Sequence, residues 1–188
     1  MCIDIIYNGG DLLKVPDDFN LLVTLSGQKG ASAGEEIVGL EEIEMALSQY
    51  EGELRVKDSD FPNVLKFDLD MNPLEAVNII RNSPTTVVSK VVPVEAVVRT
   101  RLDSIVEKIL ALASEKVKPG ETFQVICDLR GRRYIKSPEE VTERVSEALA
   151  DRLALKESDS PDWIIQVEVV GDETGVSVLR PGDVLKKP

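Results

Sequence analysis

The sequence TFQVICDLRGRRYIKSPEEV, residues 122–141, joins a strand pattern to a helix start through a cationic loop. Apolar and polar residues alternate over TFQVICD, as they do in a β-strand with one buried face. Ser137 and Pro138 are followed by two glutamates, which is the pattern of an N-cap serine, a proline at the first helical position and a capping box. The stretch therefore predicts a strand, a loop and a helix that begins at Pro138.

Helix and strand patterns continue on both sides of this stretch. From Val98 to Ala113, apolar residues recur at i, i+3 and i+4 spacing, which predicts the clearest helix of the chain. After the helix that begins at Pro138, the segments WIIQVEVV and GVSVL are joined by GDET and predict a hairpin. For residues 84–188 we expect two helices, a strand, a further helix and terminal strands.

The first half shows the order β-α-β-β-α-β over residues 19–92. Strand patterns lie in NLLVTLS, ELRV, NVLKFDLD and TTVVSKVVPV, and helix patterns follow the glycine-rich loop GQKGASAGEE and begin NPLEAVNIIRNS. This is the order of the ferredoxin-like split βαβ motif. We therefore expect an α/β (α+β) protein with two domains, residues 1–83 and residues 84–188.

The amino-acid composition limits the classes of function that we expect for this protein. The 188 residues include no histidine and two cysteines, so the commonest general base, the commonest metal ligand and a disulfide framework are missing. We expect no catalytic residue, no metal site and no cofactor, and a protein that is not an enzyme. No apolar run reaches the roughly 20 residues that span a bilayer, and the N-terminus lacks a signal-peptide pattern. We expect a cytoplasmic protein with no membrane partner.

The net charge of −12 is divided unevenly. Residues 1–85 contain 6 Lys/Arg and 16 Asp/Glu, whereas residues 86–188 contain 16 and 18. An acidic protein does not coat nucleic acid indiscriminately, and we expect no DNA partner. The concentration of cations in the second half nevertheless permits one local site for phosphate groups.

Positive charge converges on the loop before Pro138. The unpaired N–H groups and the positive dipole end of the predicted helix, which Ser137 caps, point back at this loop. Arginine side chains there would match phosphate oxygens in geometry and charge. The alternative is a solvated loop whose cations pair with the glutamates of the helix. The loop cations are Arg130, Arg132, Arg133 and Lys136.

Other cations of the second half extend this pattern into a broader surface, which suits a nucleic acid backbone better than a small metabolite. Aromatic residues are sparse, so base stacking is not the expected mode of recognition, and Tyr134 is the one good stacking candidate. The further cations are Arg99, Arg101, Lys116 and Lys118, with Arg180, Lys186 and Lys187 near the C-terminus.

The second half resembles a THUMP domain, the RNA-binding module of thiouridine synthases, RNA methyltransferases and pseudouridine synthases. The resemblance lies in VVPVEAVVRTRLDSIVEKIL, then in ETFQVICDLRGRR with SPEEV, and then in LKESDSPDWIIQVEVVGDETGVSVL, between about Pro84 and Arg180. The preceding unit resembles the ferredoxin-like domain that stands before THUMP in these proteins, with LLVTLSGQKGASAGEEI and NPLEAVNIIRNSP in the corresponding places.

No modification module follows the last predicted strand, so the chain is most similar to stand-alone THUMP proteins that present tRNA to a cytidine N4-acetyltransferase. The resemblance implies non-catalytic binding of tRNA at its acceptor stem and 3′ CCA end, with a separate modifying enzyme as partner. The candidate RNA-binding residues are Lys29, Arg99, Arg101, Lys116, Lys118, Arg130, Arg132, Arg133, Lys136 and Ser137.

Two alternatives remain open on the sequence. Asp68 and Asp70 lie on one face of a predicted strand, and paired carboxylates of this kind hold Mg²⁺ in phosphoryl-transfer enzymes. The competing interpretation is that both acids simply face solvent, opposite the apolar Leu65, Phe67 and Leu69. The second alternative is an adaptor for a different enzyme, such as a tRNA methyltransferase.

Overall fold

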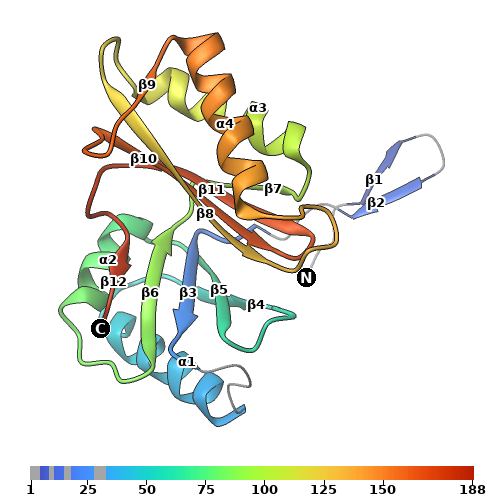
Figure 1. The fold of residues 1–188 in the computed structure, drawn as a ribbon. Helices are drawn as coiled ribbons and strands as arrows, with labels where there is room; N and C mark the ends of the chain where they lie inside the picture. The colour runs from blue at the N-terminus through green and yellow to red at the C-terminus, as the bar shows by residue number, and fades with distance from the viewer. Residues whose placement is uncertain (1–4, 9–10, 15–17, 28–32) are drawn as a thin grey trace.

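The computed structural model describes residues 5–8, 11–14, 18–27 and 33–188. Over these residues the chain forms two five-stranded sheets, four helices and a separate two-stranded hairpin. The two sheets pack face to face, and a pair of helices covers the outer face of each sheet (Figure 1). The α/β class expected from the sequence is confirmed.

The first sheet is antiparallel and has the strand order β12-β6-β3-β5-β4. From β3 to β6 its elements follow the expected order β-α-β-β-α-β, and β5 pairs between β3 and β4. Asn72 caps α2 by accepting a hydrogen bond from the N–H of Leu74, and Pro73 is the first helical residue, as predicted. The elements are β3 (Leu21–Leu25), α1 (Ala33–Leu47), β4 (Leu54–Lys57), β5 (Val64–Leu69), α2 (Pro73–Arg81), β6 (Val88–Pro93) and β12 (Leu185–Lys186).

The second sheet has the order β7-β11-β10-β8-β9. β10 is parallel to β8 and antiparallel to β11, so that β10 and β11 form the predicted hairpin. Two helices, α3 and α4, cover its outer face (Figure 1). The elements are β7 (Ala96–Arg99), α3 (Leu102–Lys116), β8 (Thr122–Arg130), α4 (Pro138–Leu153), β9 (Lys156–Glu157), β10 (Trp163–Val170) and β11 (Glu173–Leu179).

The segment before α3 differs from the prediction. The sequence predicts a helix that includes Val98, but residues 96–99 form β7, in which Val98 pairs with Thr174 of β11. α3 begins after Arg101, whose backbone is still extended (φ −136°, ψ 133°). One helix rather than two therefore precedes β8 in this half. The β-branched residues Val97 and Val98, which the prediction placed near the helix start, instead belong to β7, an edge strand of the second sheet.

The sheets do not divide the chain at residues 83–84. β6 follows that point and pairs with β3 in the first sheet, and the chain enters the second sheet at β7. β12 then returns to the first sheet, where Leu185 pairs with Val91 of β6. The first sheet is thus completed by two strands from beyond residue 83: β6, which belongs to the β-α-β-β-α-β order predicted over residues 19–92, and β12, which the sequence analysis did not place in this sheet.

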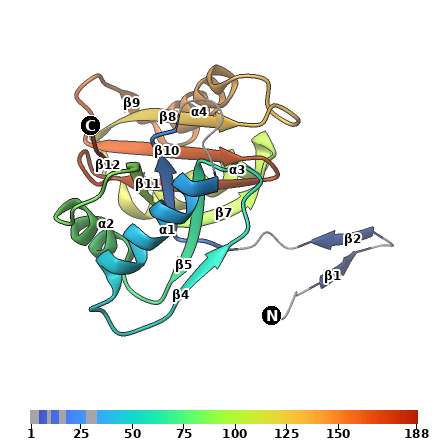
Figure 2. The ribbon, with the colours of Figure 1, turned by 90° about the horizontal axis from the view of Figure 1, so that it is seen from below.

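An N-terminal hairpin lies apart from both sheets. It consists of β1 (Ile5–Asn8) and β2 (Asp11–Lys14), which pair with each other in antiparallel fashion. Figure 2 shows it extending away from the rest of the fold. Within the described part of the chain, no helix is long and apolar enough to cross a membrane.

Alternation along the strands builds separate apolar clusters. In β3, Leu21 and Val23 face α1 and α2, whereas Leu22 faces the second sheet. In β10, Val167 and Val169 pack with α3 and α4. Side chains point to opposite faces at successive strand positions, so the residue between these two valines must face the first sheet. That residue is Glu168, and it is fully buried.

Glu168 is neutralised by cations from both sheets. Its Oε1 lies 2.7 Å from Nζ of Lys90 on β6, and its Oε2 lies 2.7 Å from Nη1 of Arg130 on β8. Lys90 also pairs with Asp128, and Arg130 donates a 3.0 Å hydrogen bond to Oγ1 of Thr24 on β3. We call Lys90, Asp128, Arg130 and Glu168 the inter-sheet ionic bridge.

The ion pair between Lys90 and Asp128 depends on the ionised carboxylate of Asp128. Burial acts to raise the pKa of Asp128, but the hydrogen bond and charge of Lys90 outweigh it and hold this pKa below its ordinary value. Because the pKa of Asp128 is lower in the folded than in the unfolded state, its carboxylate stabilises the fold at pH values above the unfolded-state pKa. That contribution is lost as the pH falls through the folded-state value.

We predict that Glu168→Gln destabilises the protein by about 3–5 kcal/mol, because the substitution keeps the shape but removes the shared anion of two largely buried cations and leaves Arg130 without an ion-pair partner. Chemical denaturation measures the free energy of unfolding. Glu107→Gln is the matched control, because Glu107 pairs with Arg152 on the surface, where such a pair contributes at most about 1 kcal/mol. Equal effects of the two substitutions would contradict the role assigned to the bridge.

Candidate nucleic-acid interface

The topology brings three connections to one end of the second sheet. β8 and β10 are parallel, with Arg130 paired beside Val170, so the loop after β8 lies next to the turn after β10. Arg99, the last residue of β7, pairs with Glu173 just beyond that turn. The chain therefore enters α3 at the same end of the sheet at which it leaves β8 for α4.

The helices α3 and α4 both start at this end. Asp103 in the first turn of α3 pairs with Arg144 of α4 at 3.3 Å, and Glu107, one turn later, pairs with Arg152 at 2.7 Å. Because both partners advance in the same direction, the helices run parallel, as Figure 1 shows. Two positive helix ends consequently lie side by side next to the loop after β8.

The backbone of this loop is held in place at both ends. Gly131 has a φ of +82°, and a Cβ atom there would lie 3.3 Å from Cζ of Phe61 and 3.6 Å from the backbone of Gly171. The N–H of Gly171 donates a 2.9 Å hydrogen bond to the carbonyl of Arg130. In the middle of the loop, Ile135 is fully buried in the core beneath α4. The loop therefore presents its polar side chains from a fixed base.

The start of α4 matches the predicted N-cap, with one difference. Oγ of Ser137 accepts a 3.3 Å hydrogen bond from the N–H of Glu140, as an N-cap serine should. The carboxylate of Glu140, however, accepts from the N–H of Lys136 at 3.0 Å instead of from Ser137 itself. Glu140 therefore fixes the end of the cationic loop as well as the helix.

Three loop cations are available to a ligand. Arg132, Arg133 and Lys136 are exposed, and none of them forms an ion pair with another residue that the structure describes. Arg132 donates a 2.6 Å hydrogen bond to the carbonyl of Lys136, which braces the loop across its base. The guanidinium of Arg133 lies 5.2 Å from the ring centre of Tyr134, which is 49% exposed. The geometry does not support the alternative in which these cations pair with the glutamates of α4.

Arg130 lies elsewhere than the sequence analysis expected. Its side chain turns inward, between the two sheets, and its guanidinium is bound to Glu168 and Thr24. With 13% of the side chain exposed, Arg130 supports the loop from below and is not placed to contact a nucleic acid backbone. β8 extends to Arg130, so the direction of this side chain is set by the alternation of side chains along the strand.

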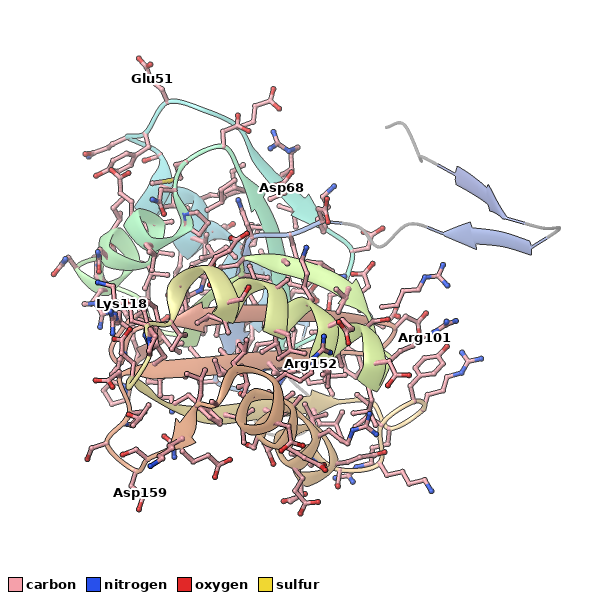
Figure 3. The ribbon with its side chains drawn as sticks, turned by 90° about the horizontal axis from the view of Figure 1, so that it is seen from above. Glu51, Asp68, Arg101, Lys118, Arg152 and Asp159 are labelled. Atoms are coloured by element: carbon pink, nitrogen blue, oxygen red, sulfur yellow. The ribbon has the colours of Figure 1, made fainter. Side chains whose placement is uncertain are left out.

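Of the two cations before α3, Arg101 belongs with the loop. It is exposed at the N-cap of α3, and Figure 3 shows it directed outward on the side where α4 begins. Arg99 is half-buried on β7. We define the cationic end of the protein as Arg101, Arg132, Arg133 and Lys136.

The remaining predicted cations do not join this group. Lys116 ends α3, which is about 22 Å long, and its Nζ lies 2.5 Å from Oε2 of Glu95 and 2.9 Å from the carbonyl of Val178. Lys118 is exposed on the side of the molecule opposite Arg101 (Figure 3). Lys29 lies outside the described residues.

The carboxylates proposed as a magnesium site are already paired. Nε of Arg55 lies 3.0 Å from Asp68, and Nη2 of Arg55 lies 2.7 Å from Asp70. The hydrogen bond from Arg55 lowers the pKa of Asp70. Among the described residues there is no group of three or more His, Cys, Asp or Glu that could hold a metal ion. The arrangement matches the interpretation of surface carboxylates on a strand.

Cys127 is equally unsuited to chemistry. Burial, together with the negative charges of Glu168 and Asp128, raises the pKa of its thiol to about 12. The thiolate needed for nucleophilic attack is therefore scarce at neutral pH. Cys127 packs in the core of the second sheet, as the alternation of the strand predicted.

The model of the THUMP domain matches residues 99–179, so the chain contains a THUMP domain, an RNA-binding module of tRNA modification enzymes. The matched region includes the whole cationic end. The fold is shared with PH1313 from Pyrococcus horikoshii (TM-score 0.70, 16% identity) and TrmN from Thermus thermophilus (0.60, 20%). It is also shared with a 4-thiouridine synthetase solved in complex with RNA and ATP (0.58, 15%).

These similarities describe the fold. Each covers 90% of this chain but 55%, 46% and 42% of the respective solved chains, so this chain spans about half their length. No curated protein matches this chain in sequence.

Sequence reasoning missed two residues that shape the interface. Glu168 was treated as part of an apolar strand, although a lone acid in such a run signals a buried partner. Phe61, which packs against Gly131, comes from a loop of the first sheet, and nothing near it in sequence indicates this contact.

We predict that Arg133→Ala and Lys136→Ala each weaken tRNA binding about tenfold or more, because each removes a charged group that would bind phosphate. The slope of log affinity against log salt should also become shallower by roughly 0.7–0.9 for each phosphate that a side chain no longer neutralises. Titration of tRNA at two salt concentrations measures both quantities. Lys118→Ala is the control, since it removes an exposed cation at the opposite end.

If Lys118→Ala weakens binding as much as the loop variants do, RNA does not select the cationic end. Unchanged affinity and slope in both loop variants would mean that the loop is a solvated charge cluster.

Proposed function

We propose that this protein binds tRNA at the acceptor stem and 3′ CCA end and presents it to a separate modification enzyme, a cytidine N4-acetyltransferase. The observation that carries the proposal is the cationic end: four exposed cations without ion pairs among the described residues, inside the THUMP domain and beside two helix starts.

The arrangement suits an RNA backbone. Arginine and lysine at a helix start attract phosphate by charge, by hydrogen bonding and by the helix dipole together. The fixed base of the loop lets these groups read the spacing of phosphates and not the identity of bases. Tyr134 adds one exposed ring, next to Arg133, on which an unpaired nucleotide of a 3′ end can stack.

A non-catalytic role is part of the proposal. It is supported by the absence of histidine from the sequence, by the high pKa of the Cys127 thiol and by the occupation of Asp68 and Asp70 by Arg55. The modification chemistry would then come from the partner enzyme, while this chain supplies affinity and orientation.

We expect the purified protein to leave tRNA chemically unchanged and to increase N4-acetylcytidine formation when an N4-acetyltransferase is added. The measurement is nucleoside mass analysis after incubation with tRNA, acetyl-CoA and ATP. A modified nucleoside formed without the partner would contradict the non-catalytic role. If that activity is lost in the double variant Asp68→Asn, Asp70→Asn, the phosphoryl-transfer alternative is established. If the protein stimulates a tRNA methyltransferase and not the acetyltransferase, its partner is the methyltransferase.

Removal of the 3′ CCA should weaken tRNA binding by the intact protein, because the single-stranded end supplies both phosphates and an unpaired base. The comparison is a titration of intact and trimmed tRNA against the same protein preparation. Arg133→Ala should reduce this difference. Equal affinities for the two RNAs would show that the protein holds another part of the molecule.

A further inference from the structure

The outer helices of the first sheet enclose an apolar groove far from the cationic end. It has a volume of about 620 Å³ and lies between α1 and α2. Figure 1 shows these helices on the outer layer opposite α3 and α4. Its apolar lining consists of Val38, Met45, Ala46, Tyr50, Ile79 and Pro84.

The groove exists because α1 carries more apolar residues than the sheet can cover. Ile43 and Leu47 face the sheet and are buried. Val38 and Met45, seven residues apart and hence on one side of the helix, remain 39% and 77% exposed. A methionine in this position adapts its shape to an incoming apolar side chain.

Negative charge surrounds this apolar strip. Glu41, Glu42 and Glu75 line the groove, and none of the described lining residues is Lys or Arg. Glu42 is fixed in place, since its carboxylate accepts hydrogen bonds from the N–H and hydroxyl of Thr86 at 2.6 Å. Lys187, whose Nζ donates a 2.8 Å hydrogen bond to the carbonyl of Ser83, offsets part of the charge of Glu42, so Glu41 and Glu75 supply most of the negative charge of the rim.

We propose that this groove docks an amphipathic helix of a partner protein, whose apolar residues recur at i and i+3 or i+4 and are flanked by lysine or arginine. The apolar strip and acidic rim complement such a helix in both shape and charge. RNA phosphates would be repelled by the same acids. The identity of the partner as the modification enzyme rests on the proposed function.

A second copy of the chain fits this face poorly. Two α1–α2 surfaces brought together would bring Glu41, Glu42 and Glu75 of both copies into one interface, and like charges across an interface oppose association. The opposite placement of groove and cationic end also leaves both accessible at once. A protein helix and a tRNA can therefore occupy the molecule together.

The test uses a fluorescent 18-residue helical peptide of leucine and lysine with one apolar face. The control peptide has the same composition, with the order scrambled to abolish that face. Fluorescence anisotropy with the full chain should give an affinity at least about tenfold higher for the amphipathic peptide. Equal affinity for both peptides would overturn the proposal, because charge alone would then explain binding.

Matched variants locate the binding surface. Met45→Ser should weaken binding of the amphipathic peptide about tenfold, and Glu41→Lys should weaken it and reduce its salt dependence. Ile37→Ser is the control, because Ile37 is 57% exposed on the same helix but does not line the groove. Equal losses of affinity for Ile37→Ser and Met45→Ser would overturn the assignment to the groove.

Two further measurements separate the possible outcomes. Sedimentation of the free protein should show a monomer. A dimer that Met45→Ser dissociates would make a second copy the occupant and overturn the proposal. Met45→Ser should bind tRNA with the same affinity as the unmodified chain, and this result also verifies that the variant is folded. If tRNA competes with the peptide for binding, the two sites are not separate and the proposal is overturned. A protein that fails to bind tRNA but still selects the amphipathic peptide would contradict the proposed function and leave the groove assigned.

Discussion

The carboxylate of Glu168 is buried between two β-sheets and is neutralised by one cation from each sheet, and the position of the loop after β8 depends on this arrangement. Lys90 reaches it from the first sheet and Arg130 from the second. Arg130, the last residue of β8, pairs with Glu168 on the neighbouring strand and donates a hydrogen bond to Thr24 of the first sheet, so the inter-sheet ionic bridge fixes the point at which the cationic loop leaves the sheet. Phe61, from the loop between β4 and β5 of the first sheet, packs against Gly131, the residue that follows Arg130. The sheet without the cationic end thus helps to hold that end in place.

This coupling changes how the two halves of the chain are understood. The acidic first half is not a separate unit that merely precedes an RNA-binding half, because β6 and β12 complete its sheet from beyond residue 83. Positive and negative side chains are instead concentrated on different surfaces of the molecule. Cations without ion pairs among the described residues gather where α3 and α4 begin, and acids rim the groove between α1 and α2. A net charge of −12 is compatible with RNA binding because the field that RNA meets is local.

Much of this could be predicted from the sequence where the signal is local. The cap at Ser137, the start of α2 at Pro73 and the hairpin of β10 and β11 each depend on residues within a few positions. What could not be predicted depends on long-range packing. Val98 fits a helical repeat, yet it pairs with Thr174, and Arg130 belongs to a cationic cluster in sequence, yet it points at Glu168. Lys118 shares the sign of the loop cations but lies at the far end of α3, a distance that charge counting does not reveal.

In the proposed function, RNA is held where α3 and α4 begin, by a loop that the inter-sheet ionic bridge positions. Titration of isotope-labelled protein with a tRNA acceptor-stem minihelix carrying a 3′ CCA, followed by amide NMR, tests it most directly. We expect the largest shifts to cluster at residues 99–103 and 131–140, with little change at residues 116–118 or along α1. Shifts centred on the opposite end of α3, or on the α1–α2 face, would contradict it.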